Sequence, residues 1–593
     1  MRCSQRIHSV LIVLAILCSV AGTAQTPPNG GSSAAYQSGV AAMQRGDLST
    51  ARANFEKAVH LNPRNADAQN MLAQVLLQQG DLDNAITHFR IVVRLRPKLA
   101  IARAYLAQAL QAKGLLDEAI VELHSAVDLA PQQWQAHQAL GKALSLRKKT
   151  DEAIAEFKEA TRLAPQQAEL HDELGSLLAQ QSRFEEAEKE FREAVKLNPT
   201  YEPGYFHLGV TLSSEGEREK AQAVLEQAVT LDPQDASAWY YRGTALDAAG
   251  NPDEALRCFQ QAATLKPDFA PLQTSLGLLL QRRSDPDGAV KAFSKVVQLT
   301  PSDPEAHNNL ALAMLQRGEA DAAIKEFREA ILLRPDDAGF QGNLGTAYLQ
   351  KTDFDAAAAQ FRSALKLDPT GASLHHDLAL ALKLKDDLPG AIAEWKEAIR
   401  LDPKLADAYY SLGLTLWQSG DFPGAAERLR EAIQIKPDYA EAYYTLGTVL
   451  KQMNKLPEAA DALRQAIRLE SDFAGAHTTL AAVLRQLGDT AGAAAESQAG
   501  AEISKKKTDL QAATFATNSG RRLRNAGDLE GAISQFQAAI RAMPSYALAH
   551  YELGVALSQK GQKDEAAGEY RKAAELDPQL APPQLAPPTT PDP

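Results

Sequence analysis

One stretch in the second half of the chain decides the fold, because the chain repeats it. YYSLGLTLWQSGDFPGAAERLREAIQIKPD (Tyr409 to Asp438) is followed by YYTLGTVLKQMNKLPEAADALRQAIRLESD (Tyr443 to Asp472), which starts 34 residues later. Prolines keep the same 34-residue step at Pro63, Pro97, Pro131, Pro165, Pro199, Pro233, Pro267, Pro301, Pro335, Pro369, Pro403 and Pro437. This period predicts one structural unit that is repeated along most of the chain.

Each copy contains two helical patterns separated by a turn. In the first copy, Leu412 and Leu416 lie four residues apart on one helix face, and Gly420 begins the turn. The segment PGAAERLREAIQI then carries a second apolar stripe, which Pro437 ends because proline cannot continue a helix. One helix pair cannot bury its apolar stripe alone, so the sequence predicts an all-α stack of helix pairs.

Small residues mark where the two helices of a pair approach each other. We expect Gly413 and Ala425 to lie at this contact, where overpacking costs about 1–3 kcal/mol. Glycine also takes the first turn position in ten of sixteen repeats, which predicts a left-handed backbone there.

These residues resemble the tetratricopeptide repeat (TPR) family. The seventh repeat matches the family's favoured residues with Trp239, Gly243, Leu246, Ala255, Phe259, Ala262 and Pro267. The resemblance implies an all-α fold, a right-handed superhelical solenoid of helix-turn-helix repeats. It covers fourteen contiguous repeats over residues 32–507 and two more over 513–578.

The pattern weakens in the fourteenth repeat, where Ser497 and Gly500 replace the usual aromatic and alanine. Five inserted residues, 508–512, follow as a junction, and we expect a long or continuous helix through this region. Outside the repeats we expect a flexible leader over 25–31 and a proline-rich disordered tail over 579–593.

The first 24 residues have the pattern of a secretory signal peptide. Arg2 and Arg6 precede an apolar run over residues 10–20, and small residues lead to a cleavage site after Ala24. The apolar run is too short to span a bilayer of about 30 Å. Cys18 follows bulky residues rather than the small residue that lipoprotein signals prefer. We therefore expect an exported protein, periplasmic or secreted, with no transmembrane segment in the mature chain.

Composition excludes several kinds of function. The formal net charge of −12 argues against nucleic-acid binding, which requires a basic surface. After removal of Cys3 and Cys18 with the signal peptide, only Cys258 remains, so we expect neither a disulfide nor a thiolate metal cluster. No phosphate-binding loop, hydrolase or metalloprotease motif occurs, and we expect no enzyme activity, catalytic residue or cofactor.

Histidine recurs at the fourth place of six repeats. Tyrosine or tryptophan stands there in other repeats, so we interpret the histidines as structural rings rather than as metal ligands. They are His137, His171, His307, His375, His477 and His550.

The family resemblance also suggests where a ligand would bind, because in TPR proteins the first helices line a concave groove. Two known modes fit poorly. The chaperone-binding carboxylate clamp needs an asparagine at the ninth place, which no repeat has, and the asparagine ladder of sugar-transferring TPR enzymes is limited to Asn309 and Asn343. Only 15 residues follow Pro578, so a transferase domain is not expected. The candidate groove residues are Phe206, Tyr240, Tyr241, Asn308, Asn309, Asn343, Tyr410, Trp417 and Tyr444.

Aromatic and amide side chains suit an extended peptide or a partner helix. The sequence thus favours a non-catalytic protein–protein interaction scaffold. An alternative is a carbohydrate- or cell-wall-binding accessory protein of envelope assembly, because aromatic rings also stack on sugars. The aromatic residues could also pack only between repeats, and the partner's identity and the oligomeric state stay open.

Overall fold

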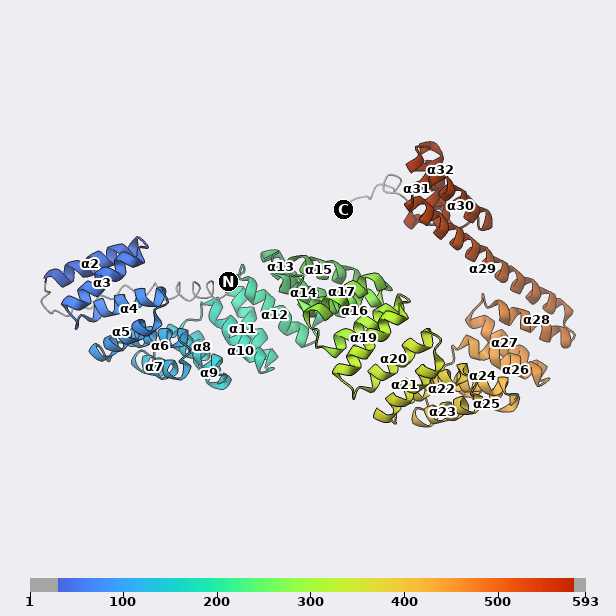
Figure 1. The fold of residues 1–593 in the computed structure, drawn as a ribbon, viewed down its shortest axis with the longest axis horizontal. Coiled ribbons are helices and arrows are strands. Elements are labelled where there is room, and N and C mark those ends of the chain that lie inside the picture. Colours follow the sequence, from blue (N-terminus) through green and yellow to red (C-terminus); the bar gives the residue numbers. More distant parts are fainter. Residues whose placement is uncertain (1–29, 581–593) are drawn as a thin grey trace. The chain divides into compact units, whose positions relative to one another are not determined.

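The computed structural model describes residues 30–580, and all regular secondary structure in that range is helical. Figure 1 shows the helices as successive antiparallel pairs, one pair for each 34-residue period. The all-α repeat fold expected from the sequence is confirmed. The predicted signal peptide over residues 1–24 lies outside the described residues, as do most of the predicted leader and residues 581–593 of the predicted tail.

The chain divides into two compact units, residues 1–299 and 300–593. The first contains α2 (Gly30–Gln44), α3 (Leu48–Leu61), α4 (Ala66–Gln78), α5 (Leu82–Leu95), α6 (Ala100–Ala112), α7 (Leu116–Leu129), α8 (Trp134–Leu146), α9 (Thr150–Leu163), α10 (Ala168–Gln180), α11 (Phe184–Leu197), α12 (Glu202–Ser214), α13 (Arg218–Leu231), α14 (Ala236–Ala248), α15 (Pro252–Leu265), α16 (Ala270–Arg282) and α17 (Pro286–Leu299).

The second unit contains α18 (Pro304–Gln316), α19 (Ala320–Leu333), α20 (Ala338–Gln350), α21 (Phe354–Leu367), α22 (Ala372–Leu384), α23 (Leu388–Leu401), α24 (Ala406–Gln418), α25 (Phe422–Ile435), α26 (Ala440–Gln452), α27 (Leu456–Leu469), α28 (Ala474–Gln486), α29 (Thr490–Asn525), α30 (Leu529–Ala542), α31 (Ala547–Lys560), α32 (Lys563–Leu576) and the short 3₁₀ helix η2 (Pro578–Leu580).

In most pairs, a small residue of the first helix faces a large side chain of the second. A Cβ added to Gly345 would lie 2.7 Å from the ring of Phe361, and one added to Gly413 would lie 2.9 Å from Leu429. The close approach expected at Gly413 is therefore present, and it accommodates the large side chain that the second helix buries. Phe361 and Leu429 are fully buried.

The turn inside each repeat uses a left-handed residue. Ten glycines have positive φ at this position, as the sequence predicted. The other six repeats adopt the same conformation without glycine, at Lys148, Ser182, Ser284, Thr352, Asp386 and Asn454. A side chain in this region of φ costs about 1–2 kcal/mol, least for asparagine and aspartate.

The boundaries differ from the sequence expectation at two points. The first helix, α2, begins at Gly30, so the last two residues of the expected leader are helical. The first residues after the sixteenth repeat form η2 rather than irregular chain. The junction over 508–512 lies within α29, a continuous helix of 36 residues, as expected. No helix among the described residues is apolar and long enough to cross a membrane.

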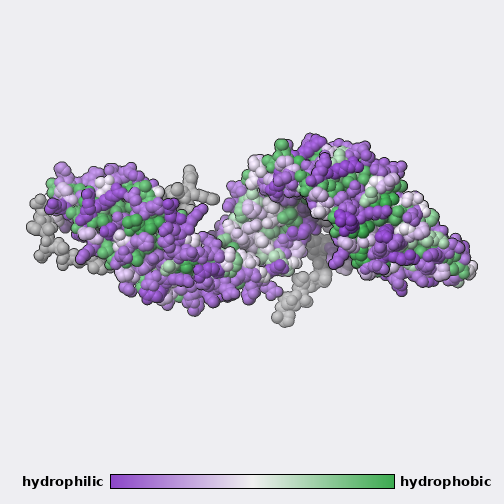
Figure 2. Space-filling view, turned by 90° about the horizontal axis from the view of Figure 1, so that it is seen from below, coloured by the Kyte–Doolittle hydropathy of each residue, from purple (hydrophilic) through white to green (hydrophobic). Residues whose placement is uncertain are grey.

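Hydrophilic residues cover most of the surface visible in Figure 2, and hydrophobic residues form smaller patches between them. This distribution is normal for stacked amphipathic helices, whose apolar stripes face their neighbours. Any binding face therefore has to be found from individual side chains and their contacts.

Candidate ligand-binding face

Within each unit, several first helices contact the first helix of the next repeat, as α10 does with α12 and α24 with α26. We number places from the start of each 34-residue repeat, the first repeat starting at residue 32. We then call the side chains at places two, five, six, nine, twelve and thirteen of the first helices the first-helix face. The candidate residues from the sequence all lie on it. Hydrogen bonds between residues 35 apart join neighbouring repeats on this face. Place five of one repeat bonds to place six of the next, and place twelve of one repeat bonds to place thirteen of the next.

In the first unit, the aromatic candidates contact one another. The rings of Phe206 and Tyr241 lie edge to face with centroids 5.5 Å apart, and Tyr240 lies 5.1 Å from Tyr241. Tyr240 also meets Phe269, which precedes the next first helix, at 5.1 Å. All three candidates are half-buried, so they form a continuous aromatic surface that links α12, α14 and α16.

A buried carboxylate on the same face has a hydrogen-bond partner at each of its two oxygens. Asp172 is 5% exposed; its Oδ1 lies 2.8 Å from Nδ1 of His207, and its Oδ2 accepts a hydrogen bond from Tyr201 at 3.2 Å. Burial and the neighbouring Asp172 raise the pKa of the Tyr201 hydroxyl, which keeps it a donor. Burial also raises the pKa of the nearby Glu202 to about 7, and Asp235 adds repulsion.

In the second unit, two aromatic candidates contact the ring that directly precedes the next first helix, and a third contacts the next first helix itself. Tyr410 meets Tyr439 with centroids 5.0 Å apart, and Tyr444 meets Phe473 at 4.8 Å. Trp417 donates its indole N–H to Oε1 of Gln452 at 2.6 Å. Tyr410, Trp417 and Tyr444 stay half-buried, so each keeps part of its ring accessible. Packing between repeats and an exposed ring surface therefore coexist in the same side chains.

The asparagine candidates divide into a bonded pair and a free residue. Asn343 donates from Nδ2 to Oδ1 of Asn308 at 2.8 Å, which joins α20 to α18. Asn309 is half-buried, and its side chain has no hydrogen bond to any described residue. The two residues expected to form a ladder, Asn309 and Asn343, thus play different parts.

The structure adds two residues that the sequence analysis missed, both on α22. Nδ1 of His376, at place five, is buried without a partner among residues 30–580. Asp377, at place six, has no hydrogen bond or ion pair in that range, and burial raises its pKa to about 6. In other repeats the residue at place five of the preceding repeat contacts place six, but here that residue is Gly342. A polar residue at place six after a glycine was the available sequence signal.

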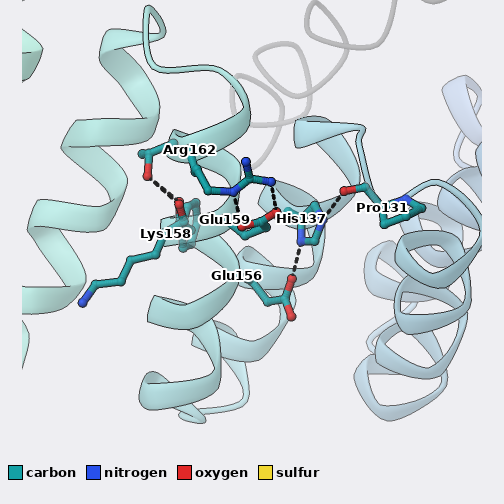
Figure 3. Close-up of polar contacts among 8 residues, drawn as sticks. Pro131, His137, Glu156, Lys158, Glu159 and Arg162 are labelled. Atoms are coloured by element: carbon teal, nitrogen blue, oxygen red, sulfur yellow. Dashed lines mark hydrogen bonds and ion pairs between the residues drawn. The ribbon is translucent and has the colours of Figure 1, made fainter.

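The six histidines at place four have a structural role, as expected, but it is polar. Figure 3 shows His137 between two acceptors: Nε2 donates to the carbonyl of Pro131 at 3.1 Å, and Nδ1 lies 2.6 Å from Glu156 of the second helix. The five other histidines make the same two contacts. The bridge therefore ties the first helix to the second helix and to the preceding loop.

A carbonyl only accepts, so Nε2 of these histidines carries the proton, and an ionised glutamate favours a proton on Nδ1 as well. In agreement, the hydrogen bond to Glu190 raises the pKa of His171 against the effect of burial. Gln69 and Gln273 donate to the same proline carbonyl where histidine is absent. The sequence signal was a glutamate 19 residues after each histidine.

The remaining reactive groups do not assemble into a centre. Cys258 is buried, and burial raises the pKa of its thiol. Within residues 30–580, no cluster of three or more histidine, cysteine, aspartate or glutamate residues could hold a metal ion.

Family models match along most of the chain. A tetratricopeptide repeat model matches residues 36–100, 274–339, 315–372, 444–506 and 517–581, and two others match 76–144 and 384–454. The chain belongs to the tetratricopeptide repeat family. A model of the middle TPR-like domain of cilia and flagella-associated protein 70 matches residues 143–266. No curated protein matches the sequence.

Solved structures of TPR proteins resemble this chain only in part. The APC/C hetero-tetramer Cut9-Hcn1 is 16% identical, with 71% of this chain and 96% of that one covered and a TM-score of 0.36. YrrB, described as a TPR protein with an unusual peptide-binding site, is 23% identical, with 32% and 96% covered and a TM-score of 0.29. Yeast Tom70 is 18% identical, with 65% and 96% covered and a TM-score of 0.28. At these values the similarities say nothing about ligands.

Family membership itself suggests a protein-interaction scaffold, and TPR proteins are typically non-catalytic.

Proposed function

We propose that this TPR protein is an exported, non-catalytic interaction scaffold that binds an extended peptide or a partner helix. The binding surface is the first-helix face of repeats 9–14, from α18 to α28. Asn309, Tyr410, Trp417 and Tyr444 contribute to it, together with the bonded pair Asn308 and Asn343.

The observation that carries this proposal is the set of polar side chains left without partners on this face. Asn309, His376 and Asp377 are half-buried, and none has a side-chain hydrogen bond to another described residue. Folded proteins satisfy most polar groups that they remove from water. An extended peptide offers backbone N–H and C=O groups to such side chains, and a bound peptide would complete their hydrogen bonds.

The aromatic side chains support the same surface. Tyr410 and Tyr444 are held on one side by Tyr439 and Phe473, so they lose little freedom when a ligand covers the other side. Rigid rings with one accessible face are common anchors in protein interfaces. In the first unit, the aromatic surface of Phe206, Tyr240 and Tyr241 has the same character. Its neighbours Asp172 and His207 are paired with each other, but Oε1 of Glu202, one turn before Phe206, is buried without a partner among the described residues.

Export is the second part of the proposal. It is supported by the basic start, the apolar run and the small residues before Ala24 in the first 24 residues. Periplasmic and secreted destinations share this signal. Peptide sequencing of the mature N-terminus tests it, and a chain that retains Met1 would contradict export.

A photo-crosslinking amino acid placed at Asn309 tests the binding surface. The matched control places it at Glu329, which is exposed on α19, the second helix of the same repeat. We expect position 309 to capture a defined protein, with little capture from position 329. Equal capture from both positions would contradict binding on the first-helix face.

The same experiment distinguishes the carbohydrate alternative. Adducts from position 309 that contain glycan and no protein would favour a cell-wall-binding accessory protein. Titration of the purified mature protein with peptides and with glycans would then measure the preference directly.

A further inference from the structure

Basic residues occupy one place of the first-helix face in the last repeats only. Place twelve of repeats 11, 13, 14 and 15 holds Lys383, Lys451, Arg485 and Arg524, and repeat 12 has Trp417. In repeats 1–10 this place has no lysine or arginine: it holds Met43, Leu77, Gln111, Ser145, Ala179, Ser213, Asp247, Gln281, Leu315 and Leu349. The chain as a whole has a net charge of −12, so positive side chains at this place distinguish the last repeats from the rest of the chain.

The basic residues of the first helices also differ in pairing. Those of repeats 3–8 each bind a carboxylate: Arg103 binds Glu122, Lys142 binds Glu173, Arg242 binds Glu226 and Arg282 binds Asp247. By contrast, the side chains of Lys383, Lys451 and Arg485 have no ion pair or hydrogen bond with any residue in 30–580. Arg524 is paired with Glu552, so it belongs to the first group.

A neighbouring lysine shows that the lack of pairing depends on the place. Lys385, two residues after Lys383, binds Asp355 of the preceding repeat, and Lys351 binds Asp321 in the same way. These residues stand at place fourteen, off the first-helix face. Cations at places twelve and fourteen therefore lie at the same end of the first helix, but only those at place fourteen lie beside a carboxylate of the preceding repeat.

Stabilisation of the helix ends explains only part of this pattern. Lys383, Lys451 and Arg485 lie in the last turns of their helices, where a cation interacts favourably with the helix dipole. The same effect acts on the first helices of repeats 1–10, which have no cation at place twelve. Lys383 is also half-buried, and burial lowers the pKa of its ammonium group, which a bound anion would reverse.

The acidic residues of α22 and α26 lie at least six residues before the cations. Asp377 precedes Lys383 by six residues, or about 9 Å along α22, and Glu441 precedes Lys451 by ten residues, or about 15 Å along α26. The cations thus form a separate row, with Trp417 between Lys383 and Lys451 in the repeat order.

We propose that the row of Lys383, Trp417, Lys451 and Arg485 binds an acidic segment of a partner protein in extended conformation. Helices in contact lie about 8–10 Å apart, and an extended chain advances about 3.3 Å per residue. The row therefore fits carboxylates about six residues apart at Lys383 and Lys451 and about three residues apart at Lys451 and Arg485, with an apolar side chain opposite Trp417. This inference rests on the proposed protein-binding function and specifies the chemistry of the partner.

A labelled peptide of about ten residues tests the proposal, with glutamate at its first, seventh and tenth positions, leucine at the fourth opposite Trp417, and serine and threonine elsewhere. The comparison peptide has glutamine in place of glutamate. Binding to the full mature protein is measured by fluorescence anisotropy at two salt concentrations, about 0.05 M and about 0.3 M. The variant is Lys383→Gln/Lys451→Gln/Arg485→Gln. The control, Lys385→Gln/Arg430→Gln/Arg464→Gln, removes equal charge from paired cations outside the first-helix face.

We expect the wild type to bind the glutamate peptide at least about tenfold more tightly than the glutamine peptide, and the preference to weaken at high salt. The row variant should lose this preference, and the control variant should keep it within about twofold. Equal binding of both peptides would overturn the acidic preference while leaving protein binding in place. Equal losses in the two variants, or no binding of either peptide, would also overturn the inference; crosslinking from position 309 tests the protein-binding function independently.

Discussion

Repeats 5–7 and repeats 11–14 use the same face of the first helices in different ways. In repeats 5 and 6, the carboxylate of Asp172 is bonded to His207 and Tyr201. In repeat 11, Asp377 has no partner among the described residues, and neither has Lys383. The carboxylate of Asp172 is thus satisfied within the chain, whereas we propose that a partner completes the hydrogen bonds of the polar groups of repeat 11.

The largest expected change in stability comes from removing the carboxylate of Asp172. Asp172→Ala would leave His207 and Tyr201 without their buried acceptor, which we expect to destabilise repeats 5 and 6 by about 2–3 kcal/mol. Hydrogen exchange of α10 and α12 measures this change locally, which suits an array whose repeats unfold separately. A loss below about 0.5 kcal/mol would contradict the importance of these bonds.

Removing the charge of the unpaired carboxylate of Asp377 in repeat 11 should instead increase stability. The raised pKa of Asp377, about 6, means that the folded protein holds its proton in the window between the unfolded value, about 3.9, and about 6. Wild-type stability therefore falls as pH rises through this window, and Asp377→Asn removes that loss.

We expect Asp377→Asn to stabilise α22 by about 1–2 kcal/mol near pH 7 and to have no such effect below about pH 4. Hydrogen exchange of α22 at the two pH values checks this. Destabilisation at about pH 7 would show that the carboxylate has a stabilising partner, and the contrast with Asp172 would fail.

A turn substitution separates stability from binding. Thr352 is β-branched and has φ 61°, so Thr352→Gly should stabilise the turn between α20 and α21 by about 1 kcal/mol. Asn454→Gly should have a smaller effect, because asparagine tolerates this conformation. Thermal unfolding ranks the two variants. Binding of the acidic peptide should not change in either, because neither residue lies on the first-helix face.

The smallest effect concerns a feature that both regions share. His171 in repeat 5 and His375 in repeat 11 make the same bridge to a glutamate and a carbonyl. The raised pKa of His171 gives a stabilisation that is complete below the unfolded pKa, about 6.5, and is lost as pH rises through the folded value.

His171→Gln keeps a donor for the carbonyl, as Gln69 does, but does not titrate. We expect it to remove a contribution of about 1 kcal/mol or less at about pH 5.5 and to change little at about pH 8. Hydrogen exchange of α10 and α11 at both pH values checks the sign. A larger loss at the higher pH would contradict the protonated bridge.

The sequence predicted the parts of this structure that are local to one repeat. The 34-residue period, the small residue at Gly413 and the left-handed turn glycines follow from helix periodicity and steric limits within about 30 residues. The histidine bridges could have been predicted too, because each histidine at place four has a glutamate at place 23, while Trp239 and Tyr409 are followed there by Cys258 and Arg428.

Contacts between repeats were harder to predict. Whether Tyr410 meets Tyr439, or Asp172 meets Tyr201 at a separation of 29 residues, depends on how one repeat is placed on the next. The sequence identified Tyr410 and Trp417 as accessible aromatics but could not show that they also join repeats. It missed His376 and Asp377, because an unpaired polar group is recognised only when all its neighbours are known.

The most direct test of the account places one photo-crosslinking amino acid at Tyr410 and, in a second strain, at Phe206. Both positions are at place five and half-buried, so the experiment compares repeats 5–7 with repeats 11–14 at matched positions. We expect position 410 to capture a specific protein and position 206 to capture little. Capture of the same protein mainly from position 206 would place the binding face in the first unit and contradict the account.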